Sequence, residues 1–501
     1  MLCLFIVRSL YGVREVRLMD INMLNKSLRA IRGQFTPTSM GVRMFMDKDE
    51  LEKPDNWLVL FHERFHYFQM IFTPYGQLKW GCYRTNSMDI IEIWANLTDE
   101  LRVSKKIPIK EYLEDGTEEG IKIAYNIAAR DLMYGIYSAI EYGPNVFKGS
   151  KYFSSLNNSS GCPVIFLDGE KYSFRVIDIL ESFAKFEEAM LGELITERNL
   201  DELIDPERLN PEYYSALYYF IEQVGVERLL EFPVVCELAL MSAHIPSPTS
   251  VEMLKKYAPN WRFLKIIEVI KDYSSLPDLD INDDESFWKY CEYVLNKCGY
   301  ENIFDSWKAA SEYAKSSDLT MSKEMQRAIE YKMSHPWLLS YPMRNFSEFI
   351  SDEFNSFQPY FTITEDGVFY NAQFIKDEEI MLENHLQALA QQICGHTSKY
   401  CQDSFKLMCG YTFMGALTCP HYLNGDCDGY IDADSTLPDV KMDGKSKILS
   451  GCTFEIVLNL YGLTIKNIII GMISYVDFDE VIKNAKNILS NLNVTNSGCK
   501  E

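Results

Sequence analysis

The sequence predicts a predominantly α-helical fold of the α+β class, and three observations lead to this class. Residues 57–72 are apolar nearly all round, which is typical of a helix buried in a large core. Residues 205–355 show helical apolar spacing, interrupted by short proline and glycine breaks. Strand patterns are small and lie near the two ends of the chain. A chain of 501 residues can hold several regions. We expect a first region at 1–205, a helical region at 206–355 and a mixed α/β region at 356–501.

The first region is expected to begin with mixed strand and loop over residues 1–55, which lead into the apolar helix. Two helices follow, at Ser87–Val103 and Glu118–Glu141. Residues 143–168 are rich in glycine, asparagine and serine, so we expect a loop there that forms the rim of a site. The segment Tyr172–Ile195 has helical apolar spacing and is predicted to be one helix.

The remaining elements follow from the same patterns. The helical region is predicted to contain helices that include Pro211–Val224, Val226–Ala243, Pro259–Lys271, Asp284–Cys298 and Met321–Met333. In the mixed region, residues 361–375 are typical of a hairpin around the turn Glu365-Asp366-Gly367. A helix at 377–394, strands at 453–461 and 466–476 and a last helix at 477–492 complete the chain.

Composition and charge exclude several classes of function. The net charge of −23 argues against binding to nucleic acid or to anionic membrane surfaces. The chain contains no apolar stretch long enough to span a bilayer. The thirteen cysteines do not form a disulfide framework, and the apolar start lacks the pattern of a signal peptide. We therefore expect a cytoplasmic protein.

The most informative motif is His-Glu-x-x-His at residues 62–66. On a helix, His62 and His66 lie on one face, where two imidazoles can bind one metal ion. Ionisable groups in so apolar a helix are costly unless they are paired or bind a metal. Pro54-Asp55-Asn56 is expected to cap the helix, and Thr73-Pro74-Tyr75-Gly76 to end it. The alternative is a buried His–Glu hydrogen-bonded cluster without a metal.

This motif resembles the active-site helix of the zincin superfamily of metallopeptidases, and the resemblance covers that helix and one later helix. It implies a zincin-like catalytic core in which His62 and His66 bind Zn²⁺ and Glu63 is the general base. The histidine that continues the metzincin motif is absent after His66. The resemblance is therefore to the gluzincin type, in which a glutamate on a second helix completes the zinc site.

Two glutamates compete for the place of third ligand. Glu181 begins the segment Glu-Ser-Phe-Ala-Lys-Phe-Glu-Glu, which resembles the gluzincin pattern Glu-Gly-x-Ala-x-x-x-Glu with Ser182 in place of glycine. Ala184 lies one turn from Glu181 and would let the two helices approach closely. The other candidate is Glu92, whose separation from His66 is closer to the spacing common in gluzincins. We favour Glu181.

A second cluster of potential ligands lies in the mixed region. Thiols and imidazoles together predict a structural zinc site there, made from Cys394, His396, Cys419, His421 and Cys427. The alternative is a set of small buried thiols, because no Cys-x-x-Cys pair is present. Residues 424–435 look like a calcium loop, but a serine stands where the bidentate glutamate belongs, so calcium is disfavoured.

These observations predict a zinc-dependent endopeptidase that hydrolyses proteins or peptides, with control by a regulatory partner left open. The alternative is a catalytically inactive, peptidase-like helical protein that binds partners through residues 205–355. Peptidases of this type often stabilise the oxyanion with a histidine, tyrosine or arginine. The sequence does not identify that residue among 31 tyrosines, nor does it single out His244, His335 or His385.

Overall fold

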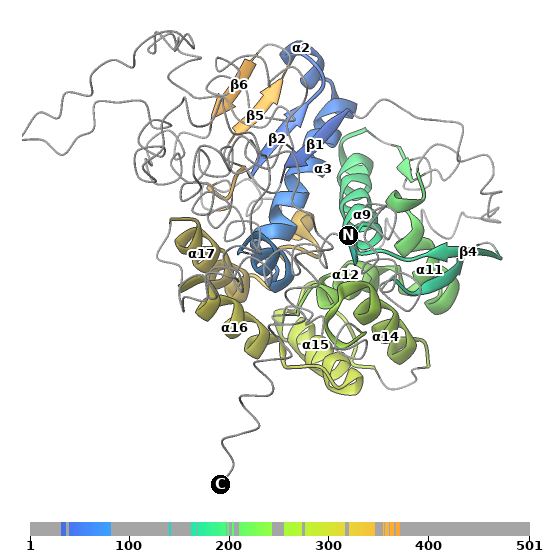
Figure 1. Ribbon diagram of the computed structural model, residues 1–501. Helices are drawn as coiled ribbons and strands as arrows, with labels where there is room; N and C mark the ends of the chain where they lie inside the picture. Colours follow the sequence, from blue (N-terminus) through green and yellow to red (C-terminus); the bar gives the residue numbers. More distant parts are fainter. Residues whose placement is uncertain are drawn as a thin grey trace, which may run out of the picture.

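The computed structural model is mostly helical, with two small β-sheets (Figure 1). The predominantly α-helical class with minor strand content is therefore confirmed. The residues that the structure describes are 32–36, 40–81, 140–141, 162–167, 169–196, 198–199, 203–204, 210–242, 255–272, 276–315, 320–345, 354, 356–359, 361–364 and 367–370.

The larger sheet joins two parts of the chain that are far apart in the sequence. Its strand order is β1 (Gly33–Thr36), β2 (Gly41–Met44), β5 (Phe361–Thr364) and β6 (Gly367–Tyr370). Strands β1 and β2 are antiparallel, β2 and β5 are parallel, and β5 and β6 form the predicted hairpin. The predicted first and third regions therefore share one sheet (Figure 1).

The smaller sheet is a hairpin that the sequence analysis missed. Strand β3 (Val164–Leu167) pairs antiparallel with β4 (Glu170–Ser173), with Leu167 opposite Glu170. Gly169 has φ +78°, a conformation that glycine adopts without steric cost and that allows this tight turn. The end of the expected loop at 143–168 is thus a strand, and Tyr172 belongs to β4 instead of the following helix.

Two long helices in the described part of the first region lie against each other. Helix α3 (Pro54–Ile71) contains the His-Glu-x-x-His motif, and α9 (Val176–Thr196) contains Glu181. The expected cap of α3 was misplaced, because the N-cap residue is Lys53 and Pro54 already begins the helix. A short helix, α2 (Lys48–Leu51), leads from β2 into α3.

The helical region contains the predicted helices, some with different boundaries. Helices α14 (Pro259–Lys271) and α15 (Asp284–Cys298) have the predicted bounds. The side chain of Asp283 caps α15, and Gly299 ends it with φ +72°. The other elements are η3 (Pro211–Tyr213), α11 (Ser215–Val224), η4 (Val226–Glu231), α12 (Phe232–Ala239), α16 (Ile303–Lys315), α17 (Thr320–Ser334) and η5 (Pro342–Asn345).

Two predicted helices of this region were too long. The segment expected as one helix at 211–224 is a 3-10 turn followed by α11, and the segment at 226–243 is a 3-10 turn followed by α12. Gly225, with φ +108°, separates α11 from η4. Pro233 lies in the first turn of α12, where its missing N–H is tolerated.

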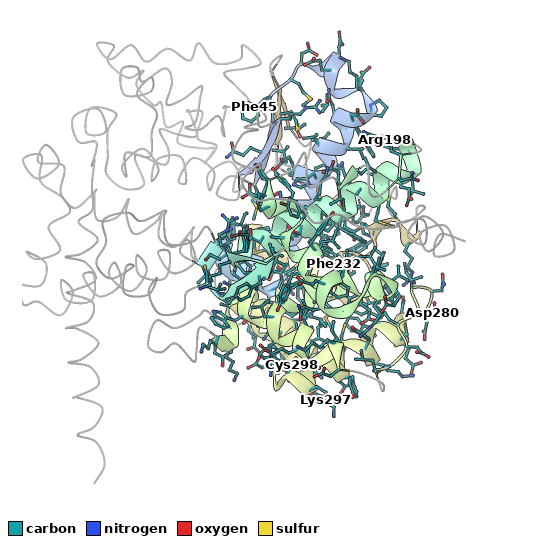
Figure 2. All side chains as sticks on the ribbon, turned by 90° about the vertical axis from the view of Figure 1, so that its right-hand side faces the viewer. Phe45, Arg198, Phe232, Asp280, Lys297 and Cys298 are labelled. Atoms are coloured by element: carbon teal, nitrogen blue, oxygen red, sulfur yellow. The ribbon has the colours of Figure 1, made fainter. Side chains whose placement is uncertain are left out.

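One hydrophobic core runs through all three predicted regions. It includes Met40 from the first region, Phe232 from the second and Phe357 from the third. Figure 2 shows side chains filling the space between the helices, with Phe232 inside and Arg198, Asp280 and Lys297 towards the outside. In the part of the chain described, no helix has the length and apolarity that crossing a membrane requires.

Several expectations fall outside the described residues. They concern the helix at 87–103 with Glu92, all but the end of the helix at 118–141, His244, His385, and every element expected after residue 370, including the cysteine–histidine cluster and the calcium-like loop.

Candidate metal centre

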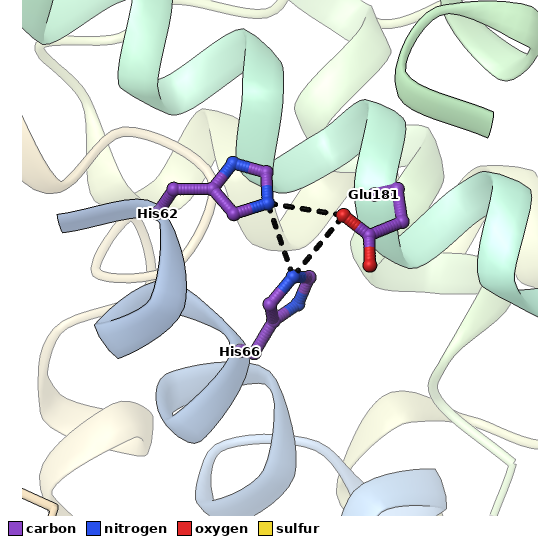
Figure 3. Close-up of side chains that lie close together, drawn as sticks. All are labelled: His62, His66 and Glu181. Atoms are coloured by element: carbon purple, nitrogen blue, oxygen red, sulfur yellow. Dashed lines mark hydrogen bonds and ion pairs between the residues drawn. The ribbon is translucent and has the colours of Figure 1, made fainter. Parts of the chain in front are cut away.

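Three predicted ligands converge at the contact between α3 and α9 (Figure 3). The Nε2 atom of His62 lies 3.0 Å from Oε2 of Glu181, and Nε2 of His66 lies 3.3 Å from the same oxygen. The two Nε2 atoms are 3.2 Å apart. The structure thus brings His62, His66 and Glu181 together, as the sequence analysis favoured.

These separations match the size of a zinc ion. A tetrahedral zinc ion with bonds of about 2.0–2.1 Å keeps its ligand atoms about 3.4 Å apart. The observed triangle, with sides of 3.0 to 3.3 Å, is only slightly tighter. Two imidazole nitrogens and one carboxylate oxygen are also a ligand set typical of catalytic zinc, which leaves a fourth position for water or substrate. The described residues therefore fit zinc in number, chemistry and spacing.

A glutamine fixes the tautomer of His66. The side-chain Nε2 of Gln69 donates a hydrogen bond to the backbone oxygen of Leu180 at 2.9 Å. Its Oε1 is 2.8 Å from Nδ1 of His66 and, as an acceptor, requires a proton on that nitrogen. The other ring nitrogen of His66, which faces Glu181, then carries a lone pair that can bind a metal.

A carboxylate plays the same part for His62. Oxygen Oε2 of Glu188 lies 3.1 Å from Nδ1 of His62, and Oε1 of Glu188 lies 2.6 Å from Nζ of Lys185. The anionic partner favours a proton on Nδ1 and leaves Nε2 of His62 free for a metal. With a proton on each Nδ1 atom, both imidazoles would present an unprotonated Nε2 to a metal ion beside Glu181.

Without a metal, the same groups retain a proton. Burial lowers the pKa of His62, but its hydrogen bonds to Glu181 and Glu188 and the charges of both carboxylates outweigh burial and raise it to about 10. Burial raises the pKa of Glu181, but the two histidines outweigh it and hold this pKa below its usual range. In the metal-free site, the protonated imidazole of His62 thus supplies the positive charge beside Glu181.

Glu63 faces the edge strand of the larger sheet. Its Oε2 accepts a hydrogen bond of 2.7 Å from the backbone N–H of Phe35 in β1. Burial raises the pKa of Glu63, while the charges of His62 and His66 partly offset this rise. A carboxylate with a raised pKa is a stronger base than an exposed glutamate.

Buried apolar side chains lie on the two helices that position the ligands. Phe61, Phe65 and Phe68 of α3 are all at most 4% exposed. The ring of Phe65 packs edge-to-face on Phe183 of α9, with centroids 5.0 Å apart. Ala184 is fully buried and presents only a methyl group at its place on α9. The low local polarity strengthens electrostatic interactions at the three ligands.

Tyr213 is a site residue that the sequence analysis did not identify. It ends the 3-10 turn η3, and its ring centroid is 5.7 Å from that of His62. Burial and the nearby charges of Glu181 and Glu63 raise its pKa, so the hydroxyl stays protonated and can donate a hydrogen bond. Its local sequence does not distinguish it from the other tyrosines. Its position beside His62 results from the path of the chain through η3.

Ser182 attaches that turn to α9. Its buried hydroxyl donates to the backbone oxygen of Glu212 at 3.1 Å and accepts from the backbone N–H of Ala216 at 3.2 Å. Ser182 therefore bridges α9 to the residues on either side of Tyr213. These two hydrogen bonds hold α9, which contains Glu181, against η3, which contains Tyr213.

The histidine of the helical region that the structure describes lies elsewhere. His335 follows α17, where its Nδ1 is 2.8 Å from the backbone oxygen of Tyr331 and its ring stacks on that tyrosine. His335 is thus a structural residue at a helix end.

Comparison with known proteins gave no match to this chain among family models, curated proteins or solved structures.

Proposed function

We propose that the protein is a zinc-dependent endopeptidase with a zincin-like centre. The proposal is supported mainly by the convergence of His62, His66 and Glu181, with the carboxylate of Glu188 behind His62 and a hydrogen bond with Gln69 behind His66. Two imidazole nitrogens and a carboxylate oxygen point at one place, and their lone pairs repel one another unless a cation or a proton lies between them, so the arrangement suits a bound cation.

The residues around this point supply the remaining functions of a hydrolase. Zinc, when bound by the three ligands, would act as a Lewis acid that polarises a peptide carbonyl and acidifies a neighbouring water. Glu63 would accept the proton of that water and pass it to the leaving amine. Tyr213 would donate a hydrogen bond to the oxygen of the scissile carbonyl as negative charge develops on it. The phenylalanines of α3 would keep bulk water away.

Detection of new protein termini tests the proposal. The zinc-loaded full chain is incubated with a denatured cell extract, and new termini are identified by mass spectrometry. We expect the wild-type chain to generate termini that disappear in Glu63→Gln, although this variant keeps its zinc. Glu222→Gln, on the exposed surface of α11, is the matched control and should cleave like wild type.

Two outcomes would contradict the proposal. One is a set of termini that is the same for wild type and Glu63→Gln, since cleavage would then not use this site. The other is a zinc-loaded wild-type chain that generates no termini at all. That result would favour a peptidase-like protein that binds partners without cleaving them.

A further inference from the structure

Strand β1 lies directly over the side chain of Glu63. The backbone N–H of Phe35 holds one carboxylate oxygen, Oε2, at 2.7 Å. Two residues earlier, a Cβ atom on Gly33 would lie 2.8 Å from Cγ and 3.0 Å from Oε1 of the same glutamate. It would also lie 3.1 Å from Cγ1 of Val59, one turn earlier on α3. Strand β1 thus holds Glu63 by a hydrogen bond from Phe35, and it leaves no room for a side chain at position 33.

We propose that Gly33 and the backbone N–H of Phe35 position Glu63 as the general base, an inference that rests on the proposed function. Among the residues that the structure describes, strand β1 is at the edge of the larger sheet and pairs with β2 on one side only. The N–H of Phe35 is therefore free to bind Glu63 instead of another strand. A hydrogen bond to a carboxylate is stronger than one between neutral groups, so it restrains the side chain.

The hydrogen bond also distinguishes the two carboxylate oxygens. Oxygen Oε2 is engaged by Phe35, which leaves Oε1 as the oxygen available for proton transfer. Oε1 is also the oxygen that a side chain at position 33 would displace. Position 33 therefore requires glycine, because the Cβ atom of any larger residue would displace Oε1 of Glu63.

The size of the expected effect follows from the sensitivity of catalysis to geometry. A displacement of about 1 Å at a reacting group can lower the rate about 100-fold. Cβ contacts of 2.8 Å and 3.0 Å are too short to persist, so Glu63 or β1 must move by several tenths of an ångström. We therefore expect Gly33→Ala to lower kcat about 10-fold to 100-fold, with little change in KM or zinc content.

Gly192 provides a matched steric control. It lies on α9, and a Cβ atom there would be 2.9 Å from Cδ1 of Leu203 and 3.1 Å from Cδ1 of Leu58, without touching Glu63. Kinetics are measured for zinc-loaded full-length protein on a fluorescence-quenched peptide that contains a cleavage site found with the wild-type chain. Gly192→Ala should retain the wild-type kcat, whereas Gly33→Ala should not. Equal kcat values for the two alanine variants would overturn the positioning role.

A double-mutant cycle provides a second measurement that does not depend on hydrolysis. Gly33→Ala should lower the urea midpoint of unfolding of the metal-free protein in the wild-type background. In the Glu63→Ala background, the two clashing atoms of Glu63 are gone and only the contact with Cγ1 of Val59 remains, so the same substitution should lower the midpoint much less. Additive shifts would overturn the contact. If instead the shifts are coupled while Glu63→Gln cleaves normally, the contact stands and the proposed peptidase function fails.

Discussion

Two buried ionic clusters in the same core differ in where their positive charge comes from. The first is the candidate metal centre, called the metal centre below, and it consists of His62, His66 and Glu181. The second, which we call the lysine cluster, consists of Glu237, Lys332 and Ser340, all fully buried. In the lysine cluster, Nζ of Lys332 is 2.7 Å from Oε1 of Glu237, and Ser340 donates a hydrogen bond of 2.5 Å to Oε2.

The lysine cluster is complete without a ligand. Lys332 also donates to the backbone oxygen of Pro336 and lies over the ring of Phe287, so its ammonium group is surrounded by partners. Burial and the charge of Glu237 raise the pKa of nearby Glu187 on α9, which favours the neutral form of this residue. The metal centre lacks a resident lysine or arginine among its three members. The lysine cluster contains its own cation, the ammonium group of Lys332, so we interpret it as structural. The metal centre contains only a bound proton as its positive charge, and a metal ion could replace that proton.

Removing the resident cation gives the largest expected effect. Lys332→Met should lower the free energy of unfolding by about 3–5 kcal/mol, because Glu237 is left buried and unpaired. The double variant Glu237→Gln, Lys332→Met should recover much of this loss, and both variants should keep wild-type zinc stoichiometry. Urea denaturation and elemental analysis measure the two quantities. Loss of zinc from folded Lys332→Met would contradict this comparison, because it would show that zinc binding depends on the lysine cluster.

Adding the missing cation should stabilise only the metal centre. With free zinc about 1,000-fold above its dissociation constant, linkage predicts about 4 kcal/mol of added stability for the wild-type chain. His66→Ala removes one of three ligands and should lose most of this gain. The comparison requires thermal unfolding of chelator-treated protein with and without zinc. A gain of equal size in His66→Ala would place the bound zinc elsewhere.

The metal-free protein should lose stability as pH rises. The folded pKa of His62 is raised to about 10, above its unfolded value of 6.5. Its contribution is therefore fully present below pH 6.5 and is lost as pH rises towards about 10. Zinc replaces the proton, so zinc affinity should increase over the same window. Urea midpoints at several pH values test this prediction, and a metal-free protein that gains stability over this window would contradict it.

Tyr213→Phe separates the hydroxyl from the ring. The variant should retain zinc but lower kcat about 10²-fold to 10³-fold, the usual effect of losing a hydrogen bond to an oxyanion. The adjacent Tyr214 is buried against Tyr218 and serves as the control, since Tyr214→Phe should leave kcat within a few-fold of wild type. Equal activities for the two phenylalanine variants would remove Tyr213 from the mechanism.

The smallest effect is expected at Ser182. Ser182→Ala removes both hydrogen bonds that attach the Tyr213 turn to α9 and should cost about 1–2 kcal/mol of stability. We expect a smaller loss of kcat than in Tyr213→Phe, and no further loss when the two substitutions are combined. Additive losses of kcat would show that Ser182 acts independently of the tyrosine.

The sequence predicted those parts of the molecule that depend on local patterns. Helix α15 was predicted with its observed boundaries because Asp283 caps one end and Gly299 the other. The helix that contains Glu181 was recognised from apolar spacing, although its start was placed four residues too early, since Val176 is its first residue. Hairpin β5–β6 was recognised from its turn residues.

Features that depend on distant contacts could not be predicted. The parallel pairing of β2 with β5, the place of Tyr213 beside His62 and the approach of Gly33 to Glu63 all join segments that are separated in the sequence. The orientation of His66 likewise depends on a hydrogen bond from Gln69 to α9. A single sequence contains the residues of these contacts but gives no signal for their pairing.

Zinc stoichiometry is the most direct test of the central claim that His62, His66 and Glu181 bind one zinc ion. The full-length chain and a His62→Ala, His66→Ala variant are purified without chelator, and zinc per chain is determined by elemental analysis. We predict that the folded variant contains one zinc ion fewer than wild type. Equal zinc content, or wild-type protein without zinc, would contradict the account.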